Sequence, residues 1–138
     1  MDVIISKTDS INRCLKRINE EYAGNLENIK DYTKQDSIVL NLQRACELSI
    51  DIANYIIAKN NYETPKTSRD AFEILYDNKI IDENISERLK KMIGFRNIAV
   101  HDYKKLDVEI IKNIIVNNLV DFENFIKQIF ENVNKNNS

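Results

Sequence analysis

The sequence predicts an all-α protein, an antiparallel bundle of about five helices, and three observations carry this prediction. The 138 residues include only two glycines and one proline, so tight turns are few and a β-sandwich or barrel is disfavoured. Apolar residues recur at three- and four-residue spacing over long stretches, which is the periodicity of one helical face. The length suits a single domain, residues 1–138, with its own hydrophobic core.

The first helix is expected from about residue 8 to residue 22. Its apolar row lies on one face and consists of Ile11, Leu15, Ile18 and Tyr22. The stretch 23–34 has no clear period, and it either extends this helix or forms a loop.

The second helix has the strongest pattern, and Asp36 or Ser37 can cap its start. Arg44, Glu47 and Asp51 form a polar row that is either solvated surface or a set of groups orienting a nearby site. Two apolar rows together make a stripe wide enough to pack against more than one neighbour. They are Ile38, Leu42, Ala45, Ser49, Ile52 and Ile56, and beside them Val39, Cys46, Ile50, Ala53 and Ile57.

Three further helices follow a loop at residues 60–66 that holds the only proline. Thr67 and Asp70 form a capping box for a short third helix, Asp82 starts a fourth, and Asp107 caps the last. The polar tail, residues 132–138, is expected to fray. The apolar positions of these helices are Ala71, Phe72, Ile74 and Leu75, then Ile85, Leu89, Met92 and Ile93, then Val108, Ile111, Ile115, Leu119, Phe122, Ile126 and Ile129.

Composition excludes several classes of protein. There is no Gly-rich phosphate loop, so neither a P-loop nor a dinucleotide fold is indicated. Cys14, Cys46 and one histidine cannot build a standard structural zinc site in one subunit, and both thiols are interpreted as buried in a reducing cytosol. We expect no metal and no other cofactor. No apolar run reaches the length of a membrane span and no signal peptide opens the chain, so a cytoplasmic protein is expected.

Residues 95–103, Phe-Arg-Asn-Ile-Ala-Val-His-Asp-Tyr, hold the most informative pattern. His101 is the only histidine in the chain; Arg96 and Asn97 precede it and Tyr103 follows. An imidazole moves protons near neutral pH, and a guanidinium holds a phosphate through two parallel hydrogen bonds. The combination predicts chemistry on a phosphodiester.

The charge around the histidine agrees with this prediction. Residues 88–105 contain six basic residues and one acidic one, a net charge of +5, whereas the whole chain carries −2 and the remainder therefore −7. Concentrated positive charge favours a local phosphate site, with Lys91, Lys104 and Lys105 as RNA-binding residues. From charge alone, a solvated basic helix end is the better interpretation.

Helical geometry and proton counting add two expectations. On one straight helix, Arg96 and His101 point about 140° apart, so joint action on one phosphate requires the helix to end or bend between them, which Gly94 permits. Metal-free RNA cleavage needs both a base and an acid, and one imidazole serves one role at a time. A homodimer that brings two motifs into one cleft supplies both.

Each motif residue also has a structural interpretation that is the better one for that residue alone. A lone histidine is more often a surface or satisfied structural residue, Arg96 and Asn97 can satisfy a helix C-terminus, and Tyr103 can be an interface aromatic. Their joint occurrence within eight residues favours the functional interpretation.

The motif and its flanks resemble the HepT-like toxins of the HEPN ribonuclease superfamily. The run Arg-Asn-Ile-Ala-Val-His-Asp-Tyr, residues 96–103, matches the family signature of arginine, four residues, histidine, one residue and tyrosine. The resemblance covers about residues 36–129 and includes Leu-Gln-Arg-Ala at 42–45, Asp-Ile-Ala at 51–53, Pro65 ahead of Ala-Phe at 71–72, and Met-Ile-Gly-Phe at 92–95.

The resemblance implies an all-α HEPN-like homodimer with metal-independent endoribonuclease activity on RNA, in a type II/VII-like toxin–antitoxin system. Arg96 and His101 would be the catalytic pair, with Asn97 as the polar residue after the arginine. It also implies an MntA-like nucleotidyltransferase antitoxin that transfers AMP from ATP to the motif tyrosine, here Tyr103.

Two other hypotheses compete with the ribonuclease toxin. One is a non-catalytic helical partner that binds a nucleotide or a nucleotidyltransferase, and the other is a purely structural helical dimer. Retention of both Arg96 and His101 favours the enzyme.

Overall fold

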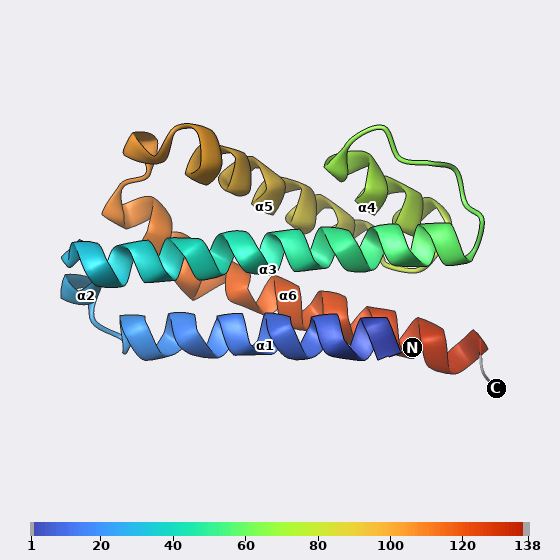
Figure 1. The fold of residues 1–138 in the computed structure, drawn as a ribbon, viewed down its shortest axis with the longest axis horizontal. Helices are drawn as coiled ribbons and strands as arrows, with labels where there is room; N and C mark the ends of the chain where they lie inside the picture. The colour runs from blue at the N-terminus through green and yellow to red at the C-terminus, as the bar shows by residue number, and fades with distance from the viewer. Residues whose placement is uncertain (1, 137–138) are drawn as a thin grey trace.

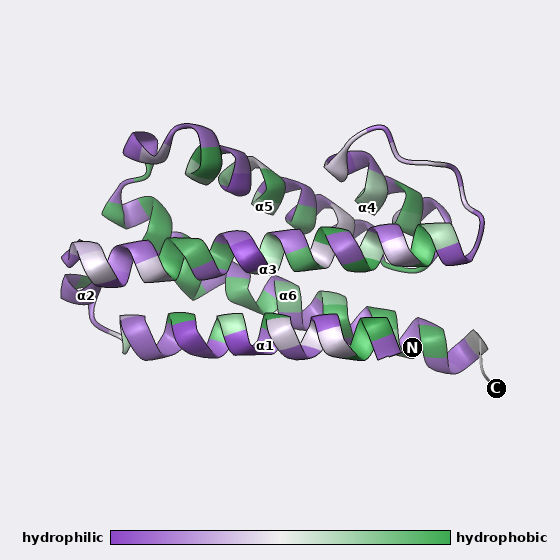
Figure 2. Ribbon diagram, viewed as in Figure 1, coloured by the Kyte–Doolittle hydropathy of each residue, from purple (hydrophilic) through white to green (hydrophobic). Residues whose placement is uncertain are grey.

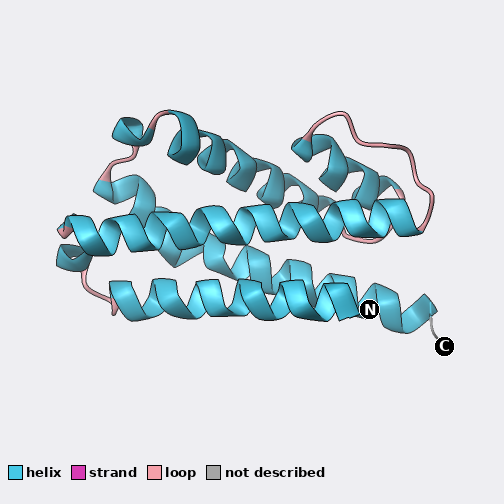
Figure 3. Ribbon diagram, viewed as in Figure 1, coloured by secondary structure: helices cyan, strands magenta, loops and turns pink. Residues whose placement is uncertain are grey.

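The computed structural model describes residues 2–136, and its architecture is the predicted antiparallel helical bundle. Six α-helices and one 3-10 turn occupy these residues, and Figure 3 shows the loops that join them, with a long one between α3 and α4. The elements are α1 (Asp2–Tyr22), α2 (Leu26–Lys30), α3 (Tyr32–Lys59), α4 (Ser68–Asp77), α5 (Glu83–His101), η1 (Tyr103–Lys105) and α6 (Val108–Asn136).

Helix α3 is the centre of the bundle and contacts α1, α2, α4, α5 and α6. It lies beside α1 in Figure 1, with α5 and α4 along its other side and α6 behind. Hydrophobic and hydrophilic residues alternate in bands along the helices (Figure 2), and both predicted apolar rows of α3 are buried. The wide stripe therefore packs against several neighbours, as predicted.

The observed element boundaries differ from the predicted ones at four places. Helix α1 begins at Asp2 rather than near residue 8, and its first turns bury Ile4. In the ambiguous stretch, Gly24 adopts a φ of 70°, a left-handed conformation that glycine takes without strain, and the short α2 follows. Helix α6 continues to Asn136, so the expected frayed tail is helical as far as that residue; residues 137–138 lie outside the described part of the chain.

The fourth difference concerns the start of α3. Neither Asp36 nor Ser37 caps it: Asp31 does so, accepting a hydrogen bond from the Lys34 backbone N–H at 3.0 Å. No glycine or proline interrupts residues 32–37, so the helix extends one turn further back. Asp36 therefore lies inside the helix, and its carboxylate does not cap the helix N-terminus.

The other predicted caps are present. The Thr67 hydroxyl accepts from Asp70 N–H at 3.0 Å, although the Asp70 carboxylate accepts in turn from Lys66 N–H rather than from Thr67. Asp82 accepts from Ile85 N–H at 2.8 Å at the start of α5. Asp107 accepts from Ile110 N–H at 2.8 Å and fixes the start of α6. These caps position the chain that enters and leaves the motif.

Candidate functional site

The motif occupies the last two turns of α5 and the 3-10 turn that follows it. Helix α5 runs without interruption to His101, and the Asp102 backbone N–H closes it by donating to the Ile98 carbonyl at 2.8 Å. Because the helix is not interrupted between Arg96 and His101, the structure does not provide the break that joint action of these two side chains of one chain on one phosphate requires. Gly94 instead permits close packing, because a Cβ there would lie 3.2 Å from the Arg69 guanidinium of α4.

Arg96 is half-buried and lies on the side of α5 that approaches α3. Its Nε atom is the only buried polar side-chain atom without a hydrogen-bond partner in residues 2–136. Burial raises the pKa of the Cys46 thiol on α3 to about 12, and the positive charge of Arg96 partly opposes that effect. A buried polar group without a hydrogen-bond partner costs free energy, so the position of Arg96 lowers the stability of the folded chain.

Asn97 and His101 lie further round the same helix. Asn97 is half-buried and His101 is exposed, and neither side chain forms a hydrogen bond or ion pair with another described residue. No side chain of Arg96 or Asn97 satisfies a carbonyl at the end of α5, so the helix-capping interpretation fails for both. Three polar groups are thus left available to a ligand.

Tyr103 begins the turn η1 rather than lying in an irregular loop. It is half-buried against the core, and its hydroxyl donates to Asp36 Oδ1 at 2.6 Å, with Gln35 Oε1 at 3.4 Å. Burial raises the pKa of Tyr103 well above its usual range, and the hydrogen bond to Asp36 and its negative charge add to this. Asp36 was considered in the sequence only as a cap, because a contact across 67 residues leaves no local pattern.

The basic cluster is partly neutralised by the fold. Arg88 pairs with Asp121 of α6 at 3.3 Å, and Lys90 pairs with Glu73 and Glu87. Of the predicted RNA-binding residues, Lys105 pairs with Asp102 at 3.1 Å, whereas Lys91 and Lys104 are exposed and have no side-chain partner among the described residues. The free positive charge near the motif therefore comes from Arg96, Lys91 and Lys104.

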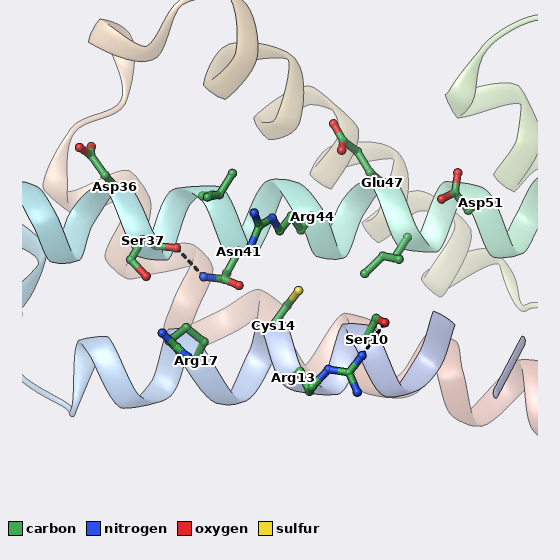
Figure 4. A pocket seen from close by; sticks show the side chains of 12 residues that line it. Ser10, Arg13, Cys14, Arg17, Asp36, Ser37, Asn41, Arg44, Glu47 and Asp51 are labelled. Carbon is green, nitrogen blue, oxygen red and sulfur yellow. Dashed lines mark hydrogen bonds between the residues drawn. The ribbon is translucent and has the colours of Figure 1, made fainter. Parts of the chain in front are cut away.

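The polar row on α3 faces a groove between α1 and α3, with a volume of about 700 Å³ (Figure 4). Arg13 and Arg17 project from α1, and Arg44 lies across from them on α3. Sequence reasoning did not single out the two α1 arginines. Three acidic residues, Asp36, Glu47 and Asp51, balance the three arginines in this lining, so the groove by itself is not a basic track for phosphates.

Both cysteines are buried and unpaired, as predicted. Histidine, cysteine and carboxylate side chains in residues 2–136 form no group of three that can hold a metal ion. In the same residues, no helix has both the length and the apolar composition needed to cross a membrane.

Comparisons with known proteins agree with this fold and motif. The mRNA nuclease HepT of Shewanella oneidensis is 47% identical over 128 residues, which are 93% of this chain and 96% of that protein. The tri-AMPylated HEPN toxin of the same organism, solved in complex with its MNT antitoxin, superposes with a TM-score of 0.90 at 47% identity, covering 95% of this chain and 98% of that one. A toxin–antitoxin structure with AMP-PNP gives a TM-score of 0.91 at 45% identity over 95% and 99% of the two chains.

These comparisons define the class as HEPN toxins, the all-helical class expected from the motif. The family model described as ribonuclease HepT-like matches residues 11–129, and the chain belongs to this family. It is a homologue of the HepT mRNA nuclease, so the predicted ribonuclease class is confirmed.

Proposed function

We propose that this chain is a metal-independent endoribonuclease toxin whose active site is built from Arg96, Asn97 and His101. The observation that supports this assignment is that none of the three side chains, all near one end of α5, forms a hydrogen bond or ion pair with another described residue. His101 would transfer protons to and from the reacting hydroxyls. Arg96 would stabilise the extra negative charge of the pentavalent phosphate, and Lys91, Lys104 and Lys105 would bind the RNA backbone.

The proposed enzyme acts as a homodimer with two motifs facing one cleft. Because α5 is continuous, Arg96 and His101 of one chain point about 140° apart, and one chain supplies a single histidine for two proton transfers. Ile98 and Val100, 39% and 47% exposed, give this end of α5 an apolar surface beside the polar groups. A second copy docked on that surface would bring another histidine and another arginine into reach.

Cleavage of cellular RNA by the purified protein tests the assignment. The wild type is expected to cut RNA, and His101→Ala is expected to lose roughly a hundred- to ten-thousand-fold in rate. The variant should keep its helical circular-dichroism signal, because His101 is exposed and its side chain forms no hydrogen bond or ion pair with another described residue. A His101→Ala protein that cuts at the wild-type rate would refute the catalytic role. A folded wild type that binds but never cuts RNA would favour the non-catalytic partner instead.

The proposed control of the toxin is adenylylation of Tyr103 by a nucleotidyltransferase antitoxin. The homologous Shewanella toxin is tri-AMPylated in its complex with an MNT antitoxin. Tyr103 lies two residues beyond His101, so an AMP group on its hydroxyl would add bulk and negative charge next to the proposed phosphate site. The modified toxin would then no longer admit RNA.

Intact-protein mass spectrometry after co-expression with the antitoxin tests this control. Wild-type chains should gain one or more AMP units and lose ribonuclease activity. Tyr103→Phe should gain none and remain toxic. A wild type that is neutralised without any gain in mass would mean that the antitoxin acts by covering the cleft.

A further inference from the structure

The Tyr103 hydroxyl has one close partner, and it is a carboxylate. It donates to Asp36 Oδ1 at 2.6 Å, a separation typical of a strong hydrogen bond from a hydroxyl to an ionised acceptor. Gln35 Oε1 lies further off, at 3.4 Å, while its amide nitrogen donates to the Ile29 carbonyl at 3.1 Å. Asp36 is therefore the group that can receive the phenolic proton.

The Asp36 carboxylate forms no other hydrogen bond or ion pair in the described structure. Asp31 caps α3 in its place, and Asp36 forms no ion pair with any described residue. Its side chain rises from the first turns of α3 at the end of the groove (Figure 4). The contact with Tyr103 is therefore the one hydrogen bond that the exposed Asp36 side chain forms with another described residue.

The surroundings of Tyr103 can admit a nucleotide. A depression of about 520 Å³ borders its ring, and the titratable groups in the lining are Lys30, Tyr32, Tyr103, Lys104 and Asp107. Within residues 2–136, Lys104 forms no hydrogen bond or ion pair through its side chain, and Lys30 pairs with Glu27 at 3.0 Å. Two ammonium groups, together with the Asp107 carboxylate, therefore line the depression beside the phenol, and positive charge there attracts phosphates.

We propose that Asp36 is the general base for adenylylation of Tyr103, so that the toxin itself supplies a catalytic group for its own inactivation. The inference rests on the proposed function, because it takes Tyr103 as the acceptor. The phenolic oxygen forms a bond to the α-phosphorus of ATP held by the antitoxin. The bond from that phosphorus to the bridging oxygen breaks, pyrophosphate leaves, and the phenolic proton passes to Asp36 and then to water.

The need for a base follows from the chemistry of the phenol. Burial and the neighbouring carboxylate both raise the pKa of Tyr103, so the phenolate is scarce at neutral pH. The nucleophile must then lose its proton as the new bond forms, and a carboxylate already in a hydrogen bond with it is placed to accept that proton. A Tyr103 that already carries AMP has no phenolic proton, so any later transfer proceeds without Asp36.

Three variants test the proposal, with purified antitoxin and ATP and the first AMP transfer followed by intact mass. Asp36→Asn should slow that transfer roughly a hundred-fold, and Asp36→Glu, which keeps a carboxylate, should recover part of the rate. Asp51→Asn makes the same charge change on the same helix, at a residue that pairs only with Lys7 at 3.2 Å, and should react like the wild type. A wild-type rate in Asp36→Asn would overturn the proposal.

The pH dependence separates a base from a residue that merely positions the ring. Without a base, transfer must use the phenolate, whose amount rises about tenfold per pH unit below the phenol's pKa. The rate of Asp36→Asn relative to wild type should therefore climb as pH rises, and the ratio cancels the pH dependence of the antitoxin itself. A reduced ratio that stays constant with pH would overturn the proposal in favour of positioning. A wild type that gains no AMP on Tyr103 would instead refute the proposed function.

Discussion

Two arginines on α5 should respond in opposite ways to the same substitution. Arg88 donates to the carboxylate of Asp121 on α6 at 3.3 Å, and that carboxylate is 1% exposed. Arg96, two turns further along, has a buried Nε with no partner. Arg88→Ala should destabilise the bundle and spare catalysis, whereas Arg96→Ala should spare the bundle and remove catalysis.

Arg88→Ala should lower the free energy of unfolding, because it leaves the buried Asp121 carboxylate without its ion-pair partner. Removing one member of a fully buried ion pair costs about 3–5 kcal/mol, but the Arg88 side chain is 43% exposed and solvent screens the pair. Asp121 also keeps its hydrogen bond from Asn118 Nδ2 at 3.0 Å. We therefore expect a loss of about 2 kcal/mol, which for a chain of this length lowers Tm by roughly 6–10 °C.

Arg96→Ala should leave the free energy of unfolding almost unchanged. The substitution removes an unsatisfied buried donor, whose burial costs about 1–3 kcal/mol. It also removes part of the apolar side-chain stem, worth about 0.8 kcal/mol for each buried methylene. The two effects oppose each other, so the free energy of unfolding should stay within about 1 kcal/mol of the wild-type value.

Urea unfolding followed by circular dichroism, at one fixed protein concentration, measures both changes, and RNA cleavage is assayed on the same samples. Arg96→Ala should lose at least about a hundred-fold in cleavage rate without a lower unfolding midpoint. Arg88→Ala should unfold at a lower urea concentration than the wild type, but should still cut RNA at temperatures below its own Tm. A loss of more than 2 kcal/mol in Arg96→Ala would refute the reasoning, because it would make Arg96 a structural residue.

Three further predictions follow from the same site. RNA cleavage should persist in EDTA, and activity lost in EDTA but restored by Mg²⁺ or Mn²⁺ would contradict the proposed metal-independent reaction. If each cleft needs two histidines, exchange with a tenfold excess of His101→Ala chains should cut the activity of each wild-type chain to about a tenth, whereas unchanged activity would exclude the shared cleft. The pKa of the Cys46 thiol is raised to about 12, and only the thiolate reacts with iodoacetamide. Cys46 should therefore resist labelling at pH 8 until urea unfolds the chain. Rapid labelling of the native protein at Cys46 would show that the thiol is accessible.

The local sequence determined the helices and most of their ends. Periodic apolar rows predicted the buried faces of α3 and α6, because burial of one helical stripe repeats every three or four residues. Caps such as Thr67 and Asp82 act within one turn and are therefore readable. The start of α3 was missed, since Asp31, Asp36 and Ser37 are all acceptable caps and nothing in residues 32–37 interrupts a helix that Asp31 caps.

The motif was likewise readable, because its residues lie within eight positions of one another. The sequence could not show that Arg88 and Lys90 are neutralised by partners on α6 and α4, while Arg96 has none. Ion pairs of this kind join helices that are distant along the chain, and their cost or benefit depends on burial.

The sequence by itself thus determined an all-helical bundle and the motif that marks its family, because both depend on the spacing of residues that are close together in the chain. Only the tertiary structure decided that α5 continues without interruption through the motif to His101, and that Asp36 meets Tyr103, 67 positions further along the chain, at 2.6 Å. Helix packing sets such a contact by bringing the first turns of α3 against the turn after α5. No periodicity in the chain encodes that meeting, because it depends on where two separately formed helices come to lie.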